Sequence, residues 1–101
     1  LWLYATADAV EDNLRRAASA AGVDTARLFF ARRVPHAQHL ARFRHADLFL
    51  DTFACNAHTT AVEALAAGLP VLTLPGTTPA ARVGESLLCA HGLDELIAGS
   101  T

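Results

Sequence analysis

The chain has 101 residues, a length that suits one domain with one hydrophobic core. Its net charge is −2. All eight basic residues are arginines scattered along the chain, which argues against a nucleic-acid-binding surface. No apolar run approaches the roughly 20 residues of a membrane span, and no secretory signal is visible. Apolar residues make up 52% of the chain. We therefore expect a partner, or another part of the same protein, to cover some apolar surface.

Strand-like and helix-like segments alternate along the chain. In chain order the pattern predicts a strand at Leu1–Tyr4, a helix at Asp8–Ala21, a strand at Arg27–Ala31, a helix at His36–Arg44, a strand at Asp47–Asp51, a helix at Thr60–Ala67, a strand at Val71–Leu74, a helix at Pro79–His91 and a last helical turn or two at Leu93–Ala98. Asp8 and Glu11 have the spacing of a capping box, and Gly22 is expected to end that helix.

The predicted strands are short and apolar throughout instead of alternating, which is typical of a parallel sheet covered on both faces. The fold class is therefore α/β, with a doubly wound, mostly parallel, Rossmann-like sheet. No internal boundary is evident, so residues 1–101 are expected to form a single domain. Because the chain begins directly in a strand-like run without Met, we expect it to be a fragment of a longer polypeptide. In such sheets ligands bind beyond the carboxyl ends of the strands, here after Phe30 and Asp51.

The loop and helix start after Asp51 form a candidate anion site. His58, Thr59 and Thr60 occupy the first turn, where unpaired backbone N–H groups and the helix dipole favour a negative charge. Their imidazole and hydroxyl groups add hydrogen bonds, so a phosphate or diphosphate is the expected guest. The alternative is purely structural, because Thr60 and Glu63 match a capping box that needs no ligand. Glu63 would suit a ribose diol only if it faces the sugar.

A second candidate group follows the predicted strand that contains Phe30. His36, His39 and Arg42 are three residues apart, which places them on neighbouring positions of one helix face, with Leu40 and Phe43 facing the core. An imidazole and a guanidinium could stack on a nucleobase and form hydrogen bonds with it. The alternative is a solvated helix face.

Metal binding is disfavoured by the spacing of the possible ligands. His36, His39, Cys55 and His58 are residue types that bind zinc, but they form no motif of ligand spacing. We therefore expect no metal and no other cofactor.

The remaining cysteines and histidines offer no catalytic group. Cys55 and Cys89 are expected to be free thiols in a reducing cytoplasm, with Cys89 in the core. His45 and His91 are expected to lie at the surface or in packing. Since no Ser-His-Asp arrangement or carboxylate pair is present, this segment is expected to bind rather than react.

Several segments together are similar to a known family. The stretches Asp47–Thr52, Cys55–Thr60, Ala67–Gly76 and Ala81–Val83 resemble the O-GlcNAc transferase/SPINDLY glycosyltransferases, glycosyltransferase family 41. The resemblance runs over nearly the whole chain. It implies the nucleotide-sugar half of a GT-B enzyme, preceded by tetratricopeptide repeats and an acceptor-side half.

The resemblance also implies which residues contact the nucleotide. The backbone at Val34, in the loop that includes Pro35, would contact the uracil together with His39 and Arg42.

The same resemblance assigns the diphosphate to His58–Thr60 and places Cys55 near the sugar. Two positions differ from the family: its ribose-contacting Lys falls at His36, and its ribose-contacting Asp falls at Glu63. Both side chains keep their hydrogen-bonding ability. His58 favours the members that use GlcNAc over relatives that use fucose.

The expected function is donor binding in a cytoplasmic, inverting glycosyltransferase that moves GlcNAc from UDP to Ser/Thr hydroxyls of protein. Its partners would be a UDP-sugar, a protein or peptide acceptor and the rest of the same polypeptide, with catalytic residues expected upstream. The alternatives are a non-catalytic nucleotide-binding or scaffolding segment, and another UDP-sugar enzyme such as an epimerase.

Overall fold

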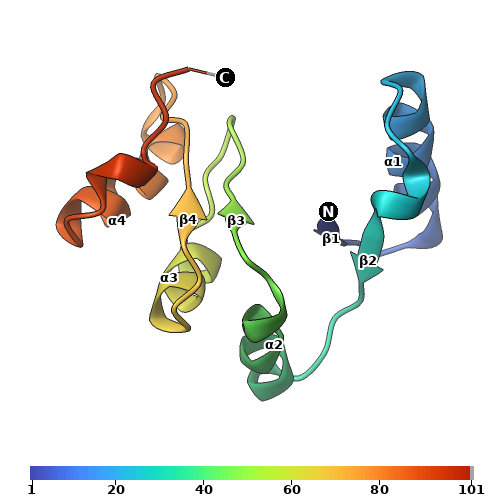
Figure 1. The fold of residues 1–101 in the computed structure, drawn as a ribbon, viewed down its shortest axis with the longest axis horizontal. Coiled ribbons are helices and arrows are strands. Elements are labelled where there is room, and N and C mark those ends of the chain that lie inside the picture. Colours follow the sequence, from blue (N-terminus) through green and yellow to red (C-terminus); the bar gives the residue numbers. More distant parts are fainter. Residues whose placement is uncertain (101) are drawn as a thin grey trace. The chain divides into compact units, whose positions relative to one another are not determined.

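The computed structural model describes residues 1–100 and divides into two compact units, Leu1–Pro35 and a second that begins at His36 (Figure 1). Each unit contains helices and one pair of parallel strands, which confirms the predicted α/β class. None of the helices in residues 1–100 combines the length and apolarity that a membrane-spanning helix needs. That residues 1–101 form one domain stays a prediction.

The first unit consists of two strands joined through a helix. Strand β1 (Trp2–Tyr4), helix α1 (Asp8–Ala20), a 3-10 turn (Thr25–Arg27) and strand β2 (Phe29–Ala31) follow one another. β1 and β2 are parallel, with Trp2 opposite Phe29. α1 ends as predicted, because Gly22 takes the positive φ of 74° that favours glycine.

The predicted capping box at the start of α1 is wrong. Ala7 is the N-cap residue, so Asp8 already lies inside the helix and caps nothing. The carboxylates of Asp8 and Glu11 instead lie 2.6 and 2.7 Å from the guanidinium of Arg32, just after β2. Asp8 and Glu11 thus pair with Arg32, which is distant in sequence, instead of capping the helix. β2 is also shorter than predicted, since the side chain of Asp24 accepts a hydrogen bond from the N–H of Ala26 and starts a 3-10 turn there.

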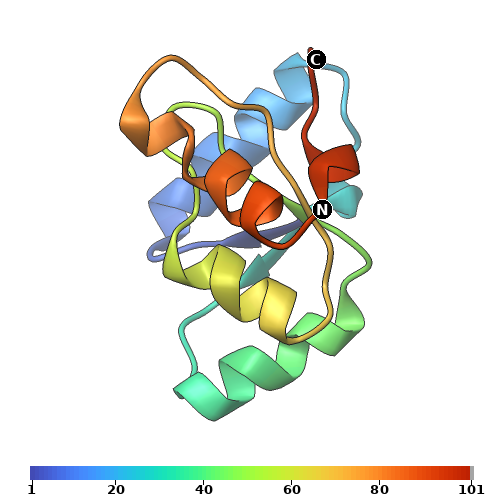
Figure 2. The ribbon, with the colours of Figure 1, turned by 90° about the vertical axis from the view of Figure 1, so that its left-hand side faces the viewer.

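The second unit contains three helices and the second strand pair (Figures 1 and 2). Its elements are α2 (His36–Arg42), a 3-10 turn (Phe43–His45), β3 (Phe49–Leu50), α3 (Thr59–Ala66), β4 (Val71–Leu72), a 3-10 turn (Pro79–Ala81), α4 (Val83–Ala90) and a 3-10 turn (Asp94–Leu96). β3 and β4 are parallel, with Phe49 opposite Val71 and Leu50 opposite Leu72. All predicted elements of this unit are therefore present, most of them shorter than expected.

Two boundaries differ for a visible reason. The helix predicted at Pro79–His91 breaks at Arg82, which separates a 3-10 turn from α4. β4 ends at Leu72 because Thr73 turns to another segment: its N–H donates to Leu96 and its carbonyl accepts from Ala98.

The core of the second unit lies where α2, α3 and α4 meet β4. Its buried residues are Phe43, Ala61, Ala64, Leu69, Val71 and Leu88, with Leu40 packed against them. The inward orientation predicted for Leu40 and Phe43 is confirmed. Alanine at the two buried positions of α3 has little side-chain bulk, which lets this helix pack closely.

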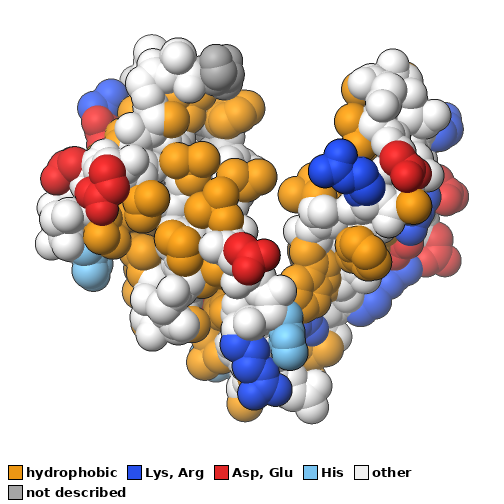
Figure 3. Space-filling view, viewed as in Figure 1, with side chains coloured by type: hydrophobic (Ala, Val, Ile, Leu, Met, Phe, Trp, Pro, Cys, Tyr) orange, Lys and Arg blue, Asp and Glu red, His pale blue; other side chains and the backbone are white. Residues whose placement is uncertain are grey.

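Residues 1–100 leave parts of the strands exposed, so the covering of both sheet faces stays a prediction. Tyr4, Phe29 and Leu50 expose more than half of their surface, while Val71 is buried. Both α3 and α4 contact β4, and apolar side chains remain visible on the surface in Figure 3. These residues alone do not supply the second covering layer that a parallel sheet requires.

Both cysteines are free, as predicted, but Cys89 is exposed and not in the core. Leu88 takes the inward position of α4, so the next residue, about 100° further around the helix, points outward. The Asp94 carboxylate accepts a hydrogen bond from the thiol and thereby raises the pKa of Cys89, with partial desolvation and the charges of Asp94 and Glu85 adding to the effect. A raised pKa lowers the thiolate fraction and makes this cysteine less reactive.

The fully buried Leu88 provides a test of the core. Leu88→Ala is expected to lower the free energy of unfolding by about 2–5 kcal/mol, because it removes apolar contacts and leaves a cavity. Leu48→Ala is the matched control, since that side chain is 44% exposed, and it should cost less than about 1 kcal/mol. Urea unfolding and calorimetry of the intact protein measure both; equal losses would contradict the assigned core.

Candidate functional site

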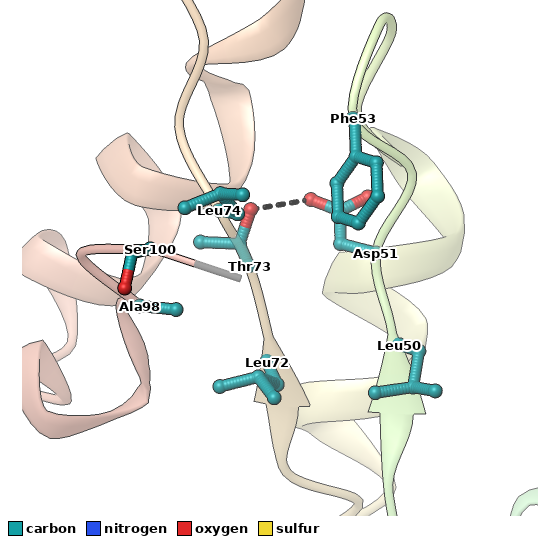
Figure 4. Close-up of a pocket in the computed structure, with 8 residues that line it drawn as sticks. All are labelled: Leu50, Asp51, Phe53, Leu72, Thr73, Leu74, Ala98 and Ser100. Atoms are coloured by element: carbon teal, nitrogen blue, oxygen red, sulfur yellow. Dashed lines mark hydrogen bonds between the residues drawn. The ribbon is translucent and has the colours of Figure 1, made fainter.

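A buried carboxylate organises the loop between β3 and α3. Asp51, 8% exposed, directly follows β3. Its Oδ1 accepts hydrogen bonds from the backbone N–H groups of Thr52 (2.9 Å) and Ala57 (2.7 Å). Its Oδ2 accepts from the hydroxyl of Thr73 at 2.8 Å, which ties the loop to the segment after β4 (Figure 4). One side chain therefore closes the loop at both ends and anchors it to the neighbouring strand.

Asn56 holds the same loop from the side of α4. This residue is 4% exposed, and its Nδ2 donates to the carbonyl of Thr52 at 2.7 Å. Its Oδ1 accepts from the N–H of Gly84 at 3.1 Å, and its own N–H donates to the carbonyl of Ala80 at 2.8 Å. Every polar group of this amide is thus directed at backbone, which fixes the loop relative to α4.

Gly84 is required by the close approach of α4 to this network. A Cβ at this position would lie 2.5 Å from Asp51 Oδ2 and 2.5 Å from Thr73 Oγ1. Sequence reasoning did not include Asp51, Asn56 or Gly84 among the site residues. The sequence does contain a feature that indicates a role for Asp51. This carboxylate directly follows an apolar strand, and a buried carboxylate needs hydrogen-bond donors around it.

The start of α3 is uncapped. Its N-cap residue is His58, and no side chain accepts a hydrogen bond there, so the predicted capping box of Thr60 and Glu63 is wrong. Within residues 1–100 no hydrogen bond uses the backbone N–H groups of His58, Thr59 or Thr60. All three residues are exposed. These N–H groups, the hydroxyls and the imidazole can therefore face an anion together.

Glu63 is held by two imidazoles instead of by the helix start. His36 Nε2 lies 2.7 Å from Glu63 Oε1, and His39 Nε2 lies 3.6 Å from Glu63 Oε2. The ring of His39 also packs edge-on against Phe43, with centroids 5.0 Å apart. These contacts link α2 to α3 and bring three of the predicted site residues together.

The other predicted site residues are placed as follows. Cys55 is exposed on the loop, where its carbonyl accepts a hydrogen bond from the hydroxyl of Thr52. Arg42 is half-buried at the end of α2. Val34 and Pro35 follow β2 in the first unit. The roles of all four toward a nucleotide stay predictions.

A cavity of about 290 Å³ lies beside the Asp51–Thr73 hydrogen bond, and both residues line it (Figure 4). Apolar side chains dominate its wall, namely Leu50, Phe53, Leu72, Leu74 and Ala98. The Thr73 hydroxyl already donates to Asp51, so among the described residues that line this cavity only the Ser100 side chain is left as a hydroxyl donor for a diphosphate. The start of α3 therefore stays the candidate anion site.

Metal ligands were considered at His36, His39, Cys55 and His58. In the part of the chain that the structure describes, no three His, Cys, Asp or Glu side chains are grouped so that they could hold a metal ion. The absence of a metal requirement stays a prediction.

Comparisons with known proteins agree on one family. The family described as "Glycosyl transferase family 41" matches residues 1–101. A Caenorhabditis elegans protein named "UDP-N-acetylglucosamine--peptide N-acetylglucosaminyltransferase" is 37% identical over 97% of this chain, and the Arabidopsis thaliana protein named as the probable enzyme SEC is 41% identical over 92%. The structure of a Thermobaculum terrenum O-GlcNAc transferase mutant superposes with a TM-score of 0.94 at 37% identity, over 99% of this chain. The chain spans only 8% and 10% of the two relatives and 20% of that structure.

The contact between α2 and α3 can be tested with a double-mutant cycle. His36→Ala and Glu63→Ala should show a coupling energy of about 0.2–1 kcal/mol in the free energy of unfolding, because the pair is close but partly solvated. Gln38→Ala combined with Glu63→Ala is the control, and its two effects should be additive. Coupling no larger for the His36 pair than for the Gln38 pair would contradict the contact.

Proposed function

Because the chain belongs to glycosyltransferase family 41, we propose that it is the donor-binding part of an inverting glycosyltransferase. The proposed enzyme moves GlcNAc from UDP-GlcNAc to Ser or Thr hydroxyls of protein. The observation that carries the proposal is the uncapped, exposed start of α3, with His58, Thr59 and Thr60 around free backbone N–H groups. The names of the relatives support this donor and this acceptor class.

The start of α3 suits the charge that develops in this reaction. When the acceptor oxygen attacks the anomeric carbon, the bond from that carbon to the β-phosphate oxygen breaks, and negative charge grows on the departing UDP. Helix N–H groups with an aligned dipole stabilise such an anion, and hydroxyl and imidazole donors strengthen the effect. The acceptor proton passes to a base that we place outside this chain, so these residues bind and stabilise the leaving group.

The contacts around Glu63 suit the sugar part of the nucleotide. His36 and Glu63 stand where the family has its ribose-contacting Lys and Asp, and in this structure they are 2.7 Å apart. An imidazole can donate to one ribose hydroxyl while a carboxylate accepts from the other. His39, Arg42 and the backbone at Val34 complete the proposed site at the uracil, with Cys55 beside the sugar.

The rest of the proposed enzyme lies outside this chain. We propose an acceptor-side half that provides the catalytic base, tetratricopeptide repeats that contact the protein acceptor, and a cytoplasmic location. No metal is assigned a role, because the leaving group is stabilised by protein donors alone in this proposal.

His58→Ala tests the diphosphate assignment. Since a hydrogen bond to a charged group is worth about 1.5–3 kcal/mol, the variant should bind UDP roughly 10-fold to 100-fold more weakly. His91→Ala is the matched control, because its exposed imidazole lies after α4 and contacts the carbonyl of Leu87. Calorimetry on the intact protein measures both affinities, and unchanged UDP binding by the His58 variant would contradict the assignment.

Transfer of GlcNAc to a peptide separates the enzyme from its alternatives. The intact protein, incubated with labelled UDP-GlcNAc and a Ser/Thr-containing peptide, is expected to label the peptide and release UDP. UDP binding without transfer would indicate a non-catalytic nucleotide-binding protein. Conversion of the donor without labelled peptide would indicate another UDP-sugar enzyme.

A further inference from the structure

The burial of Asp51 requires an explanation beyond packing. None of the ion pairs among residues 1–100 includes this carboxylate, which is satisfied by two backbone N–H groups and one hydroxyl. Burying a charge without a counter-ion is costly, and a neutral side chain could fill the same space. A charged acceptor, however, forms hydrogen bonds roughly twice as strong as a neutral one does. Compared with a neutral side chain, Asp51 therefore forms stronger hydrogen bonds with the backbone N–H groups of Thr52 and Ala57.

The N–H group of Ala57 stands directly before the free N–H groups of the candidate anion site. Ala57 donates to Asp51 at 2.7 Å, and the next three N–H groups, from His58 to Thr60, form no hydrogen bond with described residues. Successive peptide units are rigid planes, so the position of Ala57 limits the directions of the groups that follow. Asp51 thus determines where the donors at the start of α3 point.

We propose that Asp51 is a positioning residue for the diphosphate of the donor, an inference that rests on the proposed function. It does not touch the phosphates; it acts through the backbone of Ala57. Thr73 fixes the carboxylate from the segment after β4 at 2.8 Å, and Gly84 leaves room for it at the start of α4. Asn56 holds the loop between them.

A purely electrostatic effect of Asp51 would have the opposite sign. A carboxylate behind the helix start repels an anion, so its removal alone should strengthen diphosphate binding. A positioning role predicts weaker binding after removal, because misdirected donors lose their contacts with the phosphates. Asp51→Asn discriminates further, since it removes the charge but keeps a carbonyl oxygen that can accept from Ala57.

The test compares UDP with uridine, which has no phosphate and reports the rest of the nucleotide site. In the intact protein, Asp51→Ala is expected to weaken UDP binding about 10-fold to 100-fold, because misdirected donors lose their hydrogen bonds to the charged phosphates. Uridine affinity should stay unchanged, and Asp51→Asn should fall between the wild type and Asp51→Ala. The control Asp47→Ala removes an exposed carboxylate before β3 and should change neither affinity.

A milder variant keeps the proposal testable if Asp51→Ala shows no thermal unfolding transition. Thr73→Val removes only the hydroxyl that fixes Asp51, and it should weaken UDP binding about 3-fold to 10-fold without affecting uridine. The exposed Thr77→Val is its control.

The outcomes distinguish this proposal from the proposed function. A wild type that does not bind UDP would reject both. A wild type that binds UDP more tightly than uridine, with the same ratio in Asp51→Asn and Thr73→Val, would overturn only the positioning role. Tighter UDP binding by Asp51→Asn would assign Asp51 an electrostatic effect instead. Parallel losses for UDP and uridine would indicate general destabilisation and would likewise reject the proposal.

Discussion

The second unit is arranged around one buried carboxylate that must be satisfied by dipoles. Asp51 reaches the backbone of its own loop and the hydroxyl of Thr73, and α4 approaches so closely that only glycine fits at position 84. If any of these donors moved away, a buried charge would lose its compensation, which is among the more costly defects in a protein interior. This requirement fixes the path of the loop, and the loop fixes the start of α3.

The arrangement explains how an exposed helix start can still be well ordered. Helices usually satisfy their first N–H groups with a capping side chain, and α3 does not. Its order comes from the residues before it: Asp51 holds Ala57, and Asn56 bonds to Thr52 and to Gly84. The N–H groups of the first turn remain available for a ligand because stabilisation is provided one step earlier in the chain. Preorganised donors of this kind are the usual means by which enzymes stabilise developing charge.

The contact of His36 and His39 with Glu63 is a second feature that positions side chains near the start of α3. His36 on α2 and Glu63 on α3 face each other, and one ring nitrogen of each histidine lies near the same carboxylate. The carboxylate of Glu63 on α3 and the imidazole of His36 on α2 are therefore in direct contact. In the proposed function, this pair offers a ribose diol one acceptor and one donor.

The errors of sequence-based prediction in this chain share a cause. Two spacings that match a capping box, Asp8 with Glu11 and Thr60 with Glu63, form no cap, because Arg32 and His36 draw the carboxylates to other elements. Cys89 has apolar neighbours in sequence but lies on the outer side of α4. In each case the local pattern is present, but a distant partner or the orientation of a helix decides where the side chain lies.

The amino-acid sequence by itself determined the order and type of the elements, the α/β class, the family and the helix start that bears His58, Thr59 and Thr60. The elements and their class follow from apolar periodicity and glycine stops, which operate over a few neighbouring residues. The family follows from the resemblance of several segments along the chain. Only the tertiary structure decided which groups complete the site. Asp51 meets Thr73 across 22 residues, and Asn56 meets Gly84 across 28. Such hydrogen bonds depend on the packing of β3, β4 and α4 and have no spacing that a sequence could reveal.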